Sequence, residues 1–220
     1  MTAMSPRLEV LPDAQRRLWN EFRDQLPAAF VLYGGTALAL RTGSRESEDF
    51  DFFTNDPVDA HTLTATLPFL AGAELIQAAP STATYLVERG GRVKVSFFGG
   101  LRLGRVDEPS ICEDTGVQVA SLLDLAAQKV RVVQVRAERK DYLDLMTLLQ
   151  HGISLPMALG AAQALYADFA PMVSLKALSY FGDGDLASLP EQVKRTLSDA
   201  AAAAHRPTPV PLLSERLSGR

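Results

Sequence analysis

The segment from Phe30 to Phe53, FVLYGGTALALRTGSRESEDFDFF, most constrains how this chain can fold. It opens with a short apolar run of strand character, breaks at Gly34-Gly35 and continues as a helix-forming run over residues 36–41. Gly43 stands where a helix would end in a left-handed residue. A polar loop then leads into DFDFF, whose alternation predicts a further strand. The segment therefore predicts a strand, a glycine turn, a helix and a strand in close succession.

The second of these strands carries two acids on one face. Because side chains alternate along an extended segment, Asp49 and Asp51 share a face, while Phe50 and Phe52 share the opposite face and would lie in a core. Carboxylates one pleat apart can bind hard cations such as Mg²⁺ or Mn²⁺, and two ions about 4 Å apart can clamp the oxygens of a nucleotidyl transfer. The glycine turn would offer backbone N–H groups to phosphate oxygens, and Thr36 would add a hydroxyl.

These residues also match the pattern of a known superfamily. GGT at 34–36, followed by a loop and by DFD at 49–51, resembles the signature of the DNA polymerase beta superfamily of nucleotidyltransferases. LYGGTALAL followed by Arg45, Ser47 and DFDFF is similar, more closely, to the AbiEii/AbiGii toxin group, and the later KDYLDL also fits that group. The simpler alternative is a strand-turn-helix whose glycines only turn the chain and whose acids only face solvent.

The resemblance implies an α+β fold and an activity. A nucleotidyltransferase-fold mixed sheet with flanking helices is expected over residues 12–119, a C-terminal helical domain over 120–204 and a flexible tail over 205–220. The implied activity is metal-dependent transfer of a nucleotidyl group from a nucleoside triphosphate, with Mg²⁺ or Mn²⁺ as cofactor. The implied setting is a toxin–antitoxin system with an antitoxin partner. The acceptor could be RNA, protein or a small molecule, and the fold alone does not identify it.

The resemblance also implies a role for each candidate site residue. Asp49 and Asp51 would be catalytic and would hold the metal ion. The nucleotide would be bound by the glycine turn, by the loop before the acids, which Ser47 would fix, and by basic side chains that neutralise phosphate charge. These nucleotide-binding candidates are Gly34, Gly35, Thr36, Arg45, Ser47, Lys94, Lys129 and Arg136.

One position departs from the superfamily pattern. A third carboxylate is expected on the strand next to the acids, but RVKVSFF has Ser96 there, two residues after Lys94. A serine hydroxyl is a poor Mg²⁺ ligand and cannot act as the base for an attacking hydroxyl. Glu88, Asp107 and Glu108 are the nearest acids in sequence that could replace it. The alternative function is therefore a catalytically impaired nucleotide-binding or interaction module that keeps the fold.

Periodicity predicts the remaining elements. Strands are expected over residues 73–79, 82–88, 92–98 and 117–120. Helices are expected over residues 12–26, 55–67, 121–136 and 171–180, with further helix starts at Lys140, at Ser154 and at a capping box formed by Ser188 and Glu191.

The helix expected from residue 121 bears on function. If it is continuous beyond residue 136, Lys129, Arg136 and Lys140 lie on one face and form a basic stripe, which would either hold a triphosphate or simply be solvated. Asp141 would either orient Arg136 or Lys140 or be a simple acid in a first helical turn.

Bulk composition excludes several classes of protein. A net charge of −4 over 220 residues argues against a nucleic-acid footprint across the whole surface. The single cysteine, Cys112, excludes an intrachain disulfide and a CxxC zinc site. We find no apolar span of about 20 residues and no secretory leader, so we expect no membrane association and a cytoplasmic location.

Overall fold

The computed structural model describes residues 2–219. The chain forms two compact units. The sheet unit comprises Met1–Gly104, Glu108–Ser121 and Ser214–Arg220, and the helical unit comprises Arg105–Asp107 and Leu122–Leu213. The expected division was residues 12–119, 120–204 and 205–220, so the last residues join the sheet unit in place of forming a separate tail.

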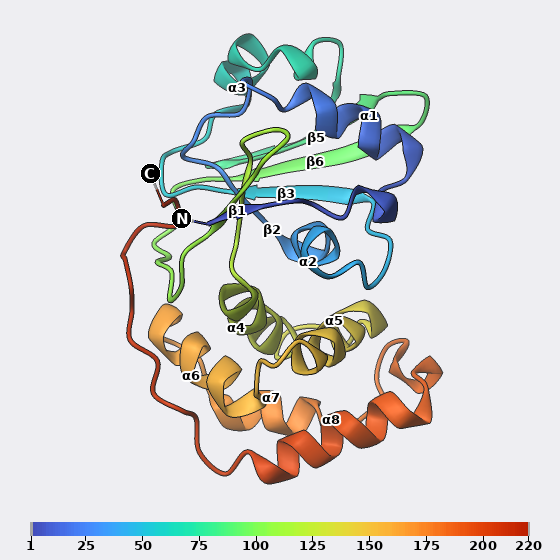
Figure 1. Cartoon of the computed structure of the whole chain (residues 1–220), viewed down its shortest axis with the longest axis vertical. Helices are drawn as coiled ribbons and strands as arrows, with labels where there is room; N and C mark the ends of the chain where they lie inside the picture. The colour runs from blue at the N-terminus through green and yellow to red at the C-terminus, as the bar shows by residue number, and fades with distance from the viewer. Residues whose placement is uncertain (1, 220) are drawn as a thin grey trace. The chain divides into compact units, whose positions relative to one another are not determined.

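The sheet unit is built on one mixed sheet of eight strands in the order β1-β7-β8-β2-β3-β6-β5-β4 (Figure 1). β3 pairs antiparallel with β2 and parallel with β6. The expected strands over 82–88 and 92–98 are confirmed as β5 and β6, which pair antiparallel. The strands are β1 (Ala3–Met4), β2 (Val31–Tyr33), β3 (Asp49–Phe53), β4 (Glu74–Ala79), β5 (Thr82–Glu88), β6 (Arg92–Phe98), β7 (Ser110–Cys112) and β8 (Gln118–Val119).

An aromatic core fixes the orientation of β3. Phe50 stacks on Trp19 of α1 (Asp13–Glu21) with ring centroids 6.0 Å apart, and Phe22 packs edge-on against Phe50 at 4.9 Å and Phe52 at 5.3 Å. Figure 1 shows α1 lying along this side of the sheet. Since Phe50 and Phe52 point into this core, alternation turns the two acids of β3 to the other face.

Two predicted helix bounds in this unit are wrong. The helix expected over 12–26 ends at Glu21, and Asp24 then adopts a φ of +58°, which an α-helix cannot continue. The helix expected over 55–67 begins only at Ala60, as α3 (Ala60–Thr66), because Asp59 accepts a hydrogen bond from the Thr62 backbone N–H at 2.8 Å and so caps it. Two short 3₁₀ helices complete the unit, η1 (Leu8–Val10) and η2 (Pro68–Leu70).

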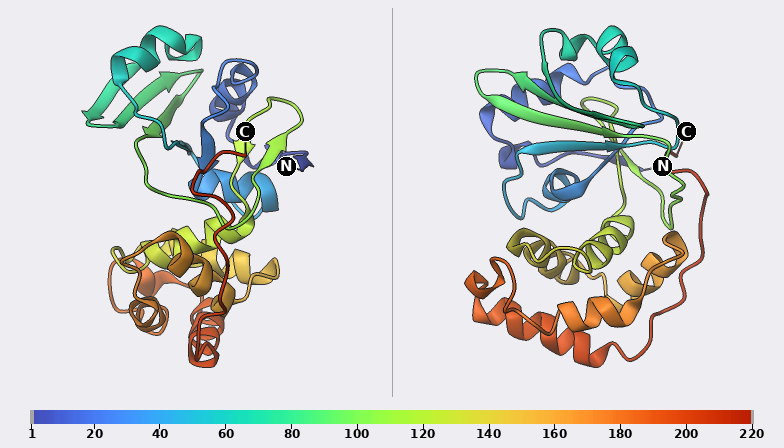
Figure 2. Two further views of the ribbon diagram at one scale, coloured as in Figure 1. Left: turned by 90° about the vertical axis from the view of Figure 1, so that its left-hand side faces the viewer. Right: turned by 180° about the vertical axis from the view of Figure 1, so that it is seen from behind.

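The helical unit contains α4 (Leu122–Val132), α5 (Arg139–Gln150), α6 (Leu155–Leu165), α7 (Pro171–Ala177), η3 (Leu186–Ser188) and α8 (Glu191–Ala203), drawn from green to red in Figure 2. The expected start at Ser154 is confirmed, since its side chain accepts from the Met157 backbone N–H. The helix expected over 121–136 is present as α4, but its expected end is wrong, because α4 stops at Val132. The β-branched residues around that point disfavour continued helix.

The predicted capping box before α8 is also wrong. Ser188 lies in η3, where its hydroxyl donates to the Asp185 carbonyl at 2.6 Å, and the residue that caps α8 is Pro190, which makes no side-chain hydrogen bond. Glu191 instead pairs with Lys194 at 2.8 Å. Similarly, α7 ends at Ala177, before the expected residue 180.

The C-terminal segment makes specific contacts with both units. In the helical unit, the Thr208 N–H donates to the Pro156 carbonyl at 2.9 Å, and the segment approaches α6 so closely that a Cβ at Gly160 would lie 1.7 Å from the Thr208 carbonyl oxygen. In the sheet unit, the Leu217 N–H donates to Asn55 Oδ1 at 2.8 Å, and the Leu217 side chain is buried. The structure thus holds these residues, which the sequence analysis expected to be flexible.

Candidate active site

The two acids of β3 share their face with two residues of β6. In the parallel pairing of these strands, Asp49 lies beside Lys94 and Asp51 beside Ser96. Alternation along β6 therefore places Lys94 and Ser96 on the acids' face, as the sequence analysis predicted. We call Asp49 and Asp51 the acid pair.

Lys94 is bonded to one member of the acid pair. Its Nζ lies 2.7 Å from Asp49 Oδ2, and both side chains are 40% exposed. The Lys94 ammonium therefore contacts the acid pair at a position that solvent and a ligand can reach.

The glycine turn brings backbone up to the acid pair. Gly34, the first residue of α2 (Gly34–Thr42), has a φ of +74°, and a Cβ there would lie 2.7 Å from Asp51 Oδ2. Two features therefore favour glycine at this position: the left-handed backbone conformation and the close approach of the Asp51 carboxylate. At the other end of the helix, Gly43 caps α2 with a φ of +69°, as predicted. The N-terminus of α2 consequently begins beside a carboxylate.

Gly35 makes room for the loop that precedes β3. A Cβ at Gly35 would lie 2.6 Å from Arg45 Nη2 and 3.0 Å from Ser47 Oγ. The Thr36 hydroxyl lies 2.9 Å from Ser47 Oγ and also hydrogen-bonds the Asp49 carbonyl oxygen. Thr36 and Ser47 thus tie the turn, the loop and the start of the acid strand together, with the Arg45 guanidinium held over the turn.

A buried residue that the sequence analysis missed supports this arrangement. Gln15 of α1 is buried, and its Nε2 donates to Thr36 Oγ1 at 3.4 Å. The available signal was a polar side chain on the apolar face of a helix, three and four residues before Leu18 and Trp19. Buried polar side chains need hydrogen-bond partners, so such a residue indicates a polar site nearby.

The acid pair has no third carboxylate beside it. Ser96 is buried, and its Oγ accepts from Thr84 Oγ1 at 3.4 Å. Among residues 2–219, no group of three or more His, Cys, Asp and Glu side chains could hold a metal ion, so Glu88, Asp107 and Glu108 do not complete such a group. The donor set fits one divalent cation held by two carboxylates, in contact with the Lys94 ammonium, and does not fit a three-carboxylate site.

The basic residues of the helical unit are held by acids. Lys129 is buried, and its Nζ lies 2.8 Å from Asp141 and 2.6 Å from Asp144. Arg136 donates to both oxygens of Asp141, from Nε at 2.7 Å and from Nη2 at 3.1 Å. Asp141 therefore orients Arg136, one of the two roles left open for it.

The continuous basic stripe predicted over Lys129, Arg136 and Lys140 is wrong. α4 ends before Arg136, and Lys140 pairs with Glu138 at 3.0 Å. Burial alone would raise the pKa of Asp141, but hydrogen bonds from Arg136 and the charge of Lys129 lower that pKa below its usual value. Asp141 is thus a buried carboxylate that stays charged at neutral pH. Nucleotide binding by Lys129 and Arg136 stays a prediction.

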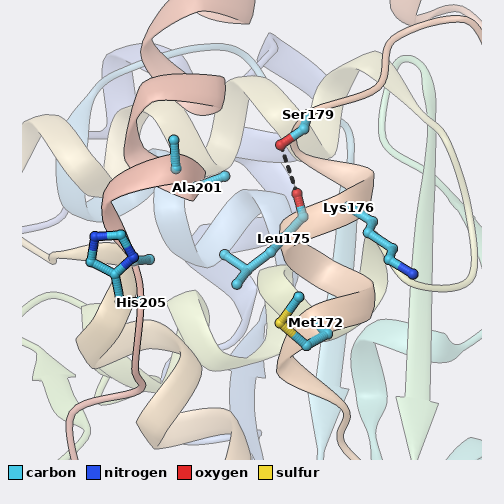
Figure 3. Close-up of a pocket in the computed structure, with 8 residues that line it drawn as sticks. Met172, Leu175, Lys176, Ser179, Ala201 and His205 are labelled. Atoms are coloured by element: carbon cyan, nitrogen blue, oxygen red, sulfur yellow. Dashed lines mark hydrogen bonds between the residues drawn. The ribbon is translucent and has the colours of Figure 1, made fainter.

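A separate pocket lies within the helical unit. It has a volume of 370 Å³ and is lined by residues of α7, α8 and the turns that follow them, including Met172, Leu175, Lys176 and His205 (Figure 3). None of the candidate site residues lines it.

Within residues 2–219, no single helix is long and apolar enough to cross a membrane, although α5 and α6, bent by 114°, pass that test as a pair.

A solved structure shares this fold. A candidate nucleotidyltransferase from H. pylori superposes with a TM-score of 0.55 at 20% identity, over 86% of this chain and 92% of that one. The nucleotidyltransferase toxin MenT4 from Mycobacterium tuberculosis H37Rv gives a TM-score of 0.48 at 14% identity, over 86% of this chain and 92% of that chain. The predicted α+β nucleotidyltransferase fold is confirmed.

Sequence comparison identifies the family as well as the fold. An uncharacterised protein of Aquifex aeolicus (strain VF5) is 31% identical over 157 residues, which make up 70% of this chain and 74% of that protein. The family described as nucleotidyl transferase AbiEii toxin, type IV toxin–antitoxin system, matches residues 16–210. Because that match spans both units, from α1 to the C-terminal segment, this chain belongs to the AbiEii family of nucleotidyltransferase toxins.

Proposed function

We propose that this protein transfers a nucleotidyl group from a nucleoside triphosphate to an acceptor, with Mg²⁺ or Mn²⁺ bound at the acid pair. The observation that carries the proposal is the placement of Asp51 beside Gly34 at the N-terminus of α2, with Arg45 over Gly35. A carboxylate that can hold a cation and a turn that can hold phosphate are thereby adjacent.

The chain's own residues account for substrate binding. Backbone N–H groups of Gly34, Gly35 and Thr36 at the start of α2 would donate to phosphate oxygens, helped by the positive end of the helix dipole. The Arg45 guanidinium would neutralise phosphate charge from above the turn, and Ser47 would keep the loop in position through Thr36. A divalent ion held by Asp49 and Asp51 would add neutralisation of the charge that develops on the phosphate.

Within the helical unit, Arg136 is the proposed phosphate contact. Arg136 pairs with Asp141 and Glu138, and its side chain is 43% exposed. Lys129 is buried between two acids, so its role would be to hold Asp141 and, through it, the Arg136 guanidinium. Orientation of one cation by a buried carboxylate preorganises a phosphate contact.

The family supports a toxin that an antitoxin partner counteracts. The proposal further places this activity in the cytoplasm and leaves RNA, protein or a small molecule as its acceptor. The second candidate function is a nucleotide-binding or interaction module without transfer. Two observations favour it: Ser96 offers no carboxylate beside Asp51, and Lys94 already occupies an oxygen of Asp49.

Incubation with labelled nucleoside triphosphates, Mg²⁺ and total RNA or cell lysate tests the proposal. We expect the wild-type protein to label an acceptor, and Asp51→Asn to lower labelling at least about a hundredfold, as removal of a group that stabilises transition-state charge does. Asp51→Asn keeps the shape of the side chain and should leave the melting temperature nearly unchanged.

Asp56→Asn is the matched control. Asp56 lies in the same unit, is exposed and pairs with Arg216 at 2.9 Å, away from the glycine turn. Labelling should survive this substitution. Full labelling by Asp51→Asn would place the site elsewhere, whereas nucleotide binding without labelling by the wild-type protein would support the binding module.

A further inference from the structure

Lys94 gives the acid pair a cation that belongs to the protein. The ammonium lies 2.7 Å from Asp49 Oδ2, in a register set by the parallel pairing of β3 and β6. Both strands are central in the sheet, with β2 beyond β3 and β5 beyond β6. The backbone therefore holds the lysine and the aspartate side by side whether or not a ligand is bound.

The charges around the acid pair limit how many ions can bind there. Asp49, Asp51 and Lys94 together carry a net charge of −1, and one divalent ion would change that sum to +1. The Arg45 guanidinium over Gly35 adds further positive charge nearby. A second divalent ion would meet this net positive charge with no further acid, because residues 2–219 hold no group of three metal-binding side chains. Ser96, the next β6 residue on this face after Lys94, is buried and uncharged.

The geometry points to a specific role for this lysine. We propose that Lys94 is a built-in cation of the acid pair, which limits the site to one divalent ion and competes with that ion for Asp49. Lys94 is thus a positioning residue that sets the metal affinity of the site, in addition to any contact it makes with phosphate. The inference rests on the proposed function only in that the acid pair is taken to hold the ion.

The exposure of the pair makes the competition feasible. Both side chains are 40% exposed, so the ammonium can swing into solvent when an ion takes its place. Asp49 also keeps its Oδ1, which allows a shared arrangement in which the ion and the ammonium bind different oxygens. In either arrangement the positive charge of Lys94 weakens ion binding, because like charges a few ångströms apart repel.

A calorimetric Mn²⁺ titration of the full chain, without nucleotide, tests the inference independently of activity. We expect the wild-type protein to bind one ion per chain, and Lys94→Met to bind one ion with a Kd lower by about tenfold or more, because one nearby like charge has been removed. Lys94→Gln gives the same comparison should the apolar methionine impair folding. Asp51→Asn should abolish binding.

Arg92→Met is the matched control. Arg92 lies on the same strand, on the same face and two residues earlier, and it forms its own ion pair with Glu74. This variant removes the same net charge from β6 without touching the acid pair, so its Kd should stay within about twofold of the wild-type value, as expected for an exposed and screened charge.

The possible outcomes separate the inference from the proposed function. Three results would overturn the role of Lys94: a Kd for Lys94→Met equal to or higher than that of the wild-type protein, two ions bound by the wild-type protein, or a Kd lowered as much in Arg92→Met as in Lys94→Met. In each case, loss of binding in Asp51→Asn would still leave the acid pair as the metal site. Two other results would overturn the metal site itself, and the role of Lys94 with it. One is that neither the wild-type protein nor Lys94→Met binds Mn²⁺, and the other is that Asp51→Asn still binds it.

Discussion

Ser96 lies beside Asp51 across the parallel strands β3 and β6, and its side chain is almost fully shielded from solvent. A hydroxyl at this place costs little to bury, because Thr84 donates to it. A carboxylate there would be buried next to another acid, which raises the free energy of its charged form. The residue at this position therefore decides how far the stability of the sheet unit depends on a bound cation.

We predict that Ser96→Asp makes stability depend on metal. In the presence of a chelator, the unfolding free energy of the variant should be roughly 1–3 kcal/mol lower than that of the wild-type protein, because no cation neutralises the buried aspartate. With Mg²⁺ or Mn²⁺ at a hundred times the Kd, about 2.7 kcal/mol should return. Thermal unfolding across an ion titration measures both effects.

Ser96→Asn is the control for this substitution. It has nearly the same shape as the aspartate variant without the charge, so its loss of stability should not respond to divalent ions. If Ser96→Asp gained no more stability from metal than the wild-type protein, Ser96 would not face the acid pair as the register indicates.

At the scale of elements, the pair of helices α4 and α5 is joined by buried charge. Lys129 of α4 reaches two acids of α5, Asp141 and Asp144, and Arg136 in the connection reaches Asp141 as well. A buried ion pair is costly to break from one side, because the remaining charge stays buried without its partner. These contacts fix the orientation of α5 relative to α4.

We predict that Asp141→Asn destabilises the helical unit in a pH-dependent way. The folded-state pKa of Asp141 is lowered from 3.8, so its charge stabilises the folded state fully above that value and stops doing so as the pH falls through the folded pKa. At pH 7 the variant should lose roughly 2–3 kcal/mol, since Asp144 remains to pair with Lys129. Urea unfolding followed by circular dichroism should show this difference shrinking below about pH 4.

Asp168→Asn serves as the comparison. Asp168 is an exposed acid that pairs with Arg131 at 2.8 Å, so the same substitution there should change stability by less than about 1 kcal/mol. A loss at Asp141 that is equally small, or that persists unchanged at acid pH, would contradict the buried charge network.

Several of these elements were predictable because their signal is local. Alternation in DFDFF and RVKVSFF is a property of the extended backbone itself, so the shared face of the acid pair, Lys94 and Ser96 followed from short strings. The strands predicted over 82–88 and 92–98 rest on equally local patterns. The left-handed C-terminus of α2 at Gly43 was equally local.

The missed features depend on partners distant in sequence. Periodicity placed Lys129 on a helix but could not show that acids of the next helix cover it, nor that α4 stops before Arg136. The order of the C-terminal segment depends on Asn55 and Gln118, which lie far back along the chain. Its prolines and mixed charge therefore resembled those of a flexible tail.

At the scale of the whole molecule, the chain leaves the sheet unit after Ser121 and returns to it at Ser214. The returning segment is anchored by Leu217, whose side chain is 1% exposed, and by the Gly219 N–H, which donates to Gln118 Oε1 at 2.8 Å. The sheet unit is thus assembled from residues at both ends of the described chain, with the helical unit inserted between them.

We predict that Leu217→Ala destabilises the sheet unit by about 2–4 kcal/mol, the usual cost of truncating a buried leucine. The single tryptophan, Trp19, lies in the core of this unit, so its fluorescence during urea unfolding reports the loss directly. Leu213→Ala, four residues earlier at a side chain that is 50% exposed, should change stability by less than about 0.5 kcal/mol. Equal effects of the two substitutions would show that the segment does not dock on the sheet.

The inserted helical unit also determines the order in which a ribosome can complete this protein. Domains tend to fold as units while they emerge during synthesis, usually beginning with the N-terminal one. Here residues 122–213 are translated before the segment that supplies Leu217 and Gly219 to the sheet unit. The nascent chain can therefore finish its helices first, while the sheet that carries the acid pair still lacks its last contacts.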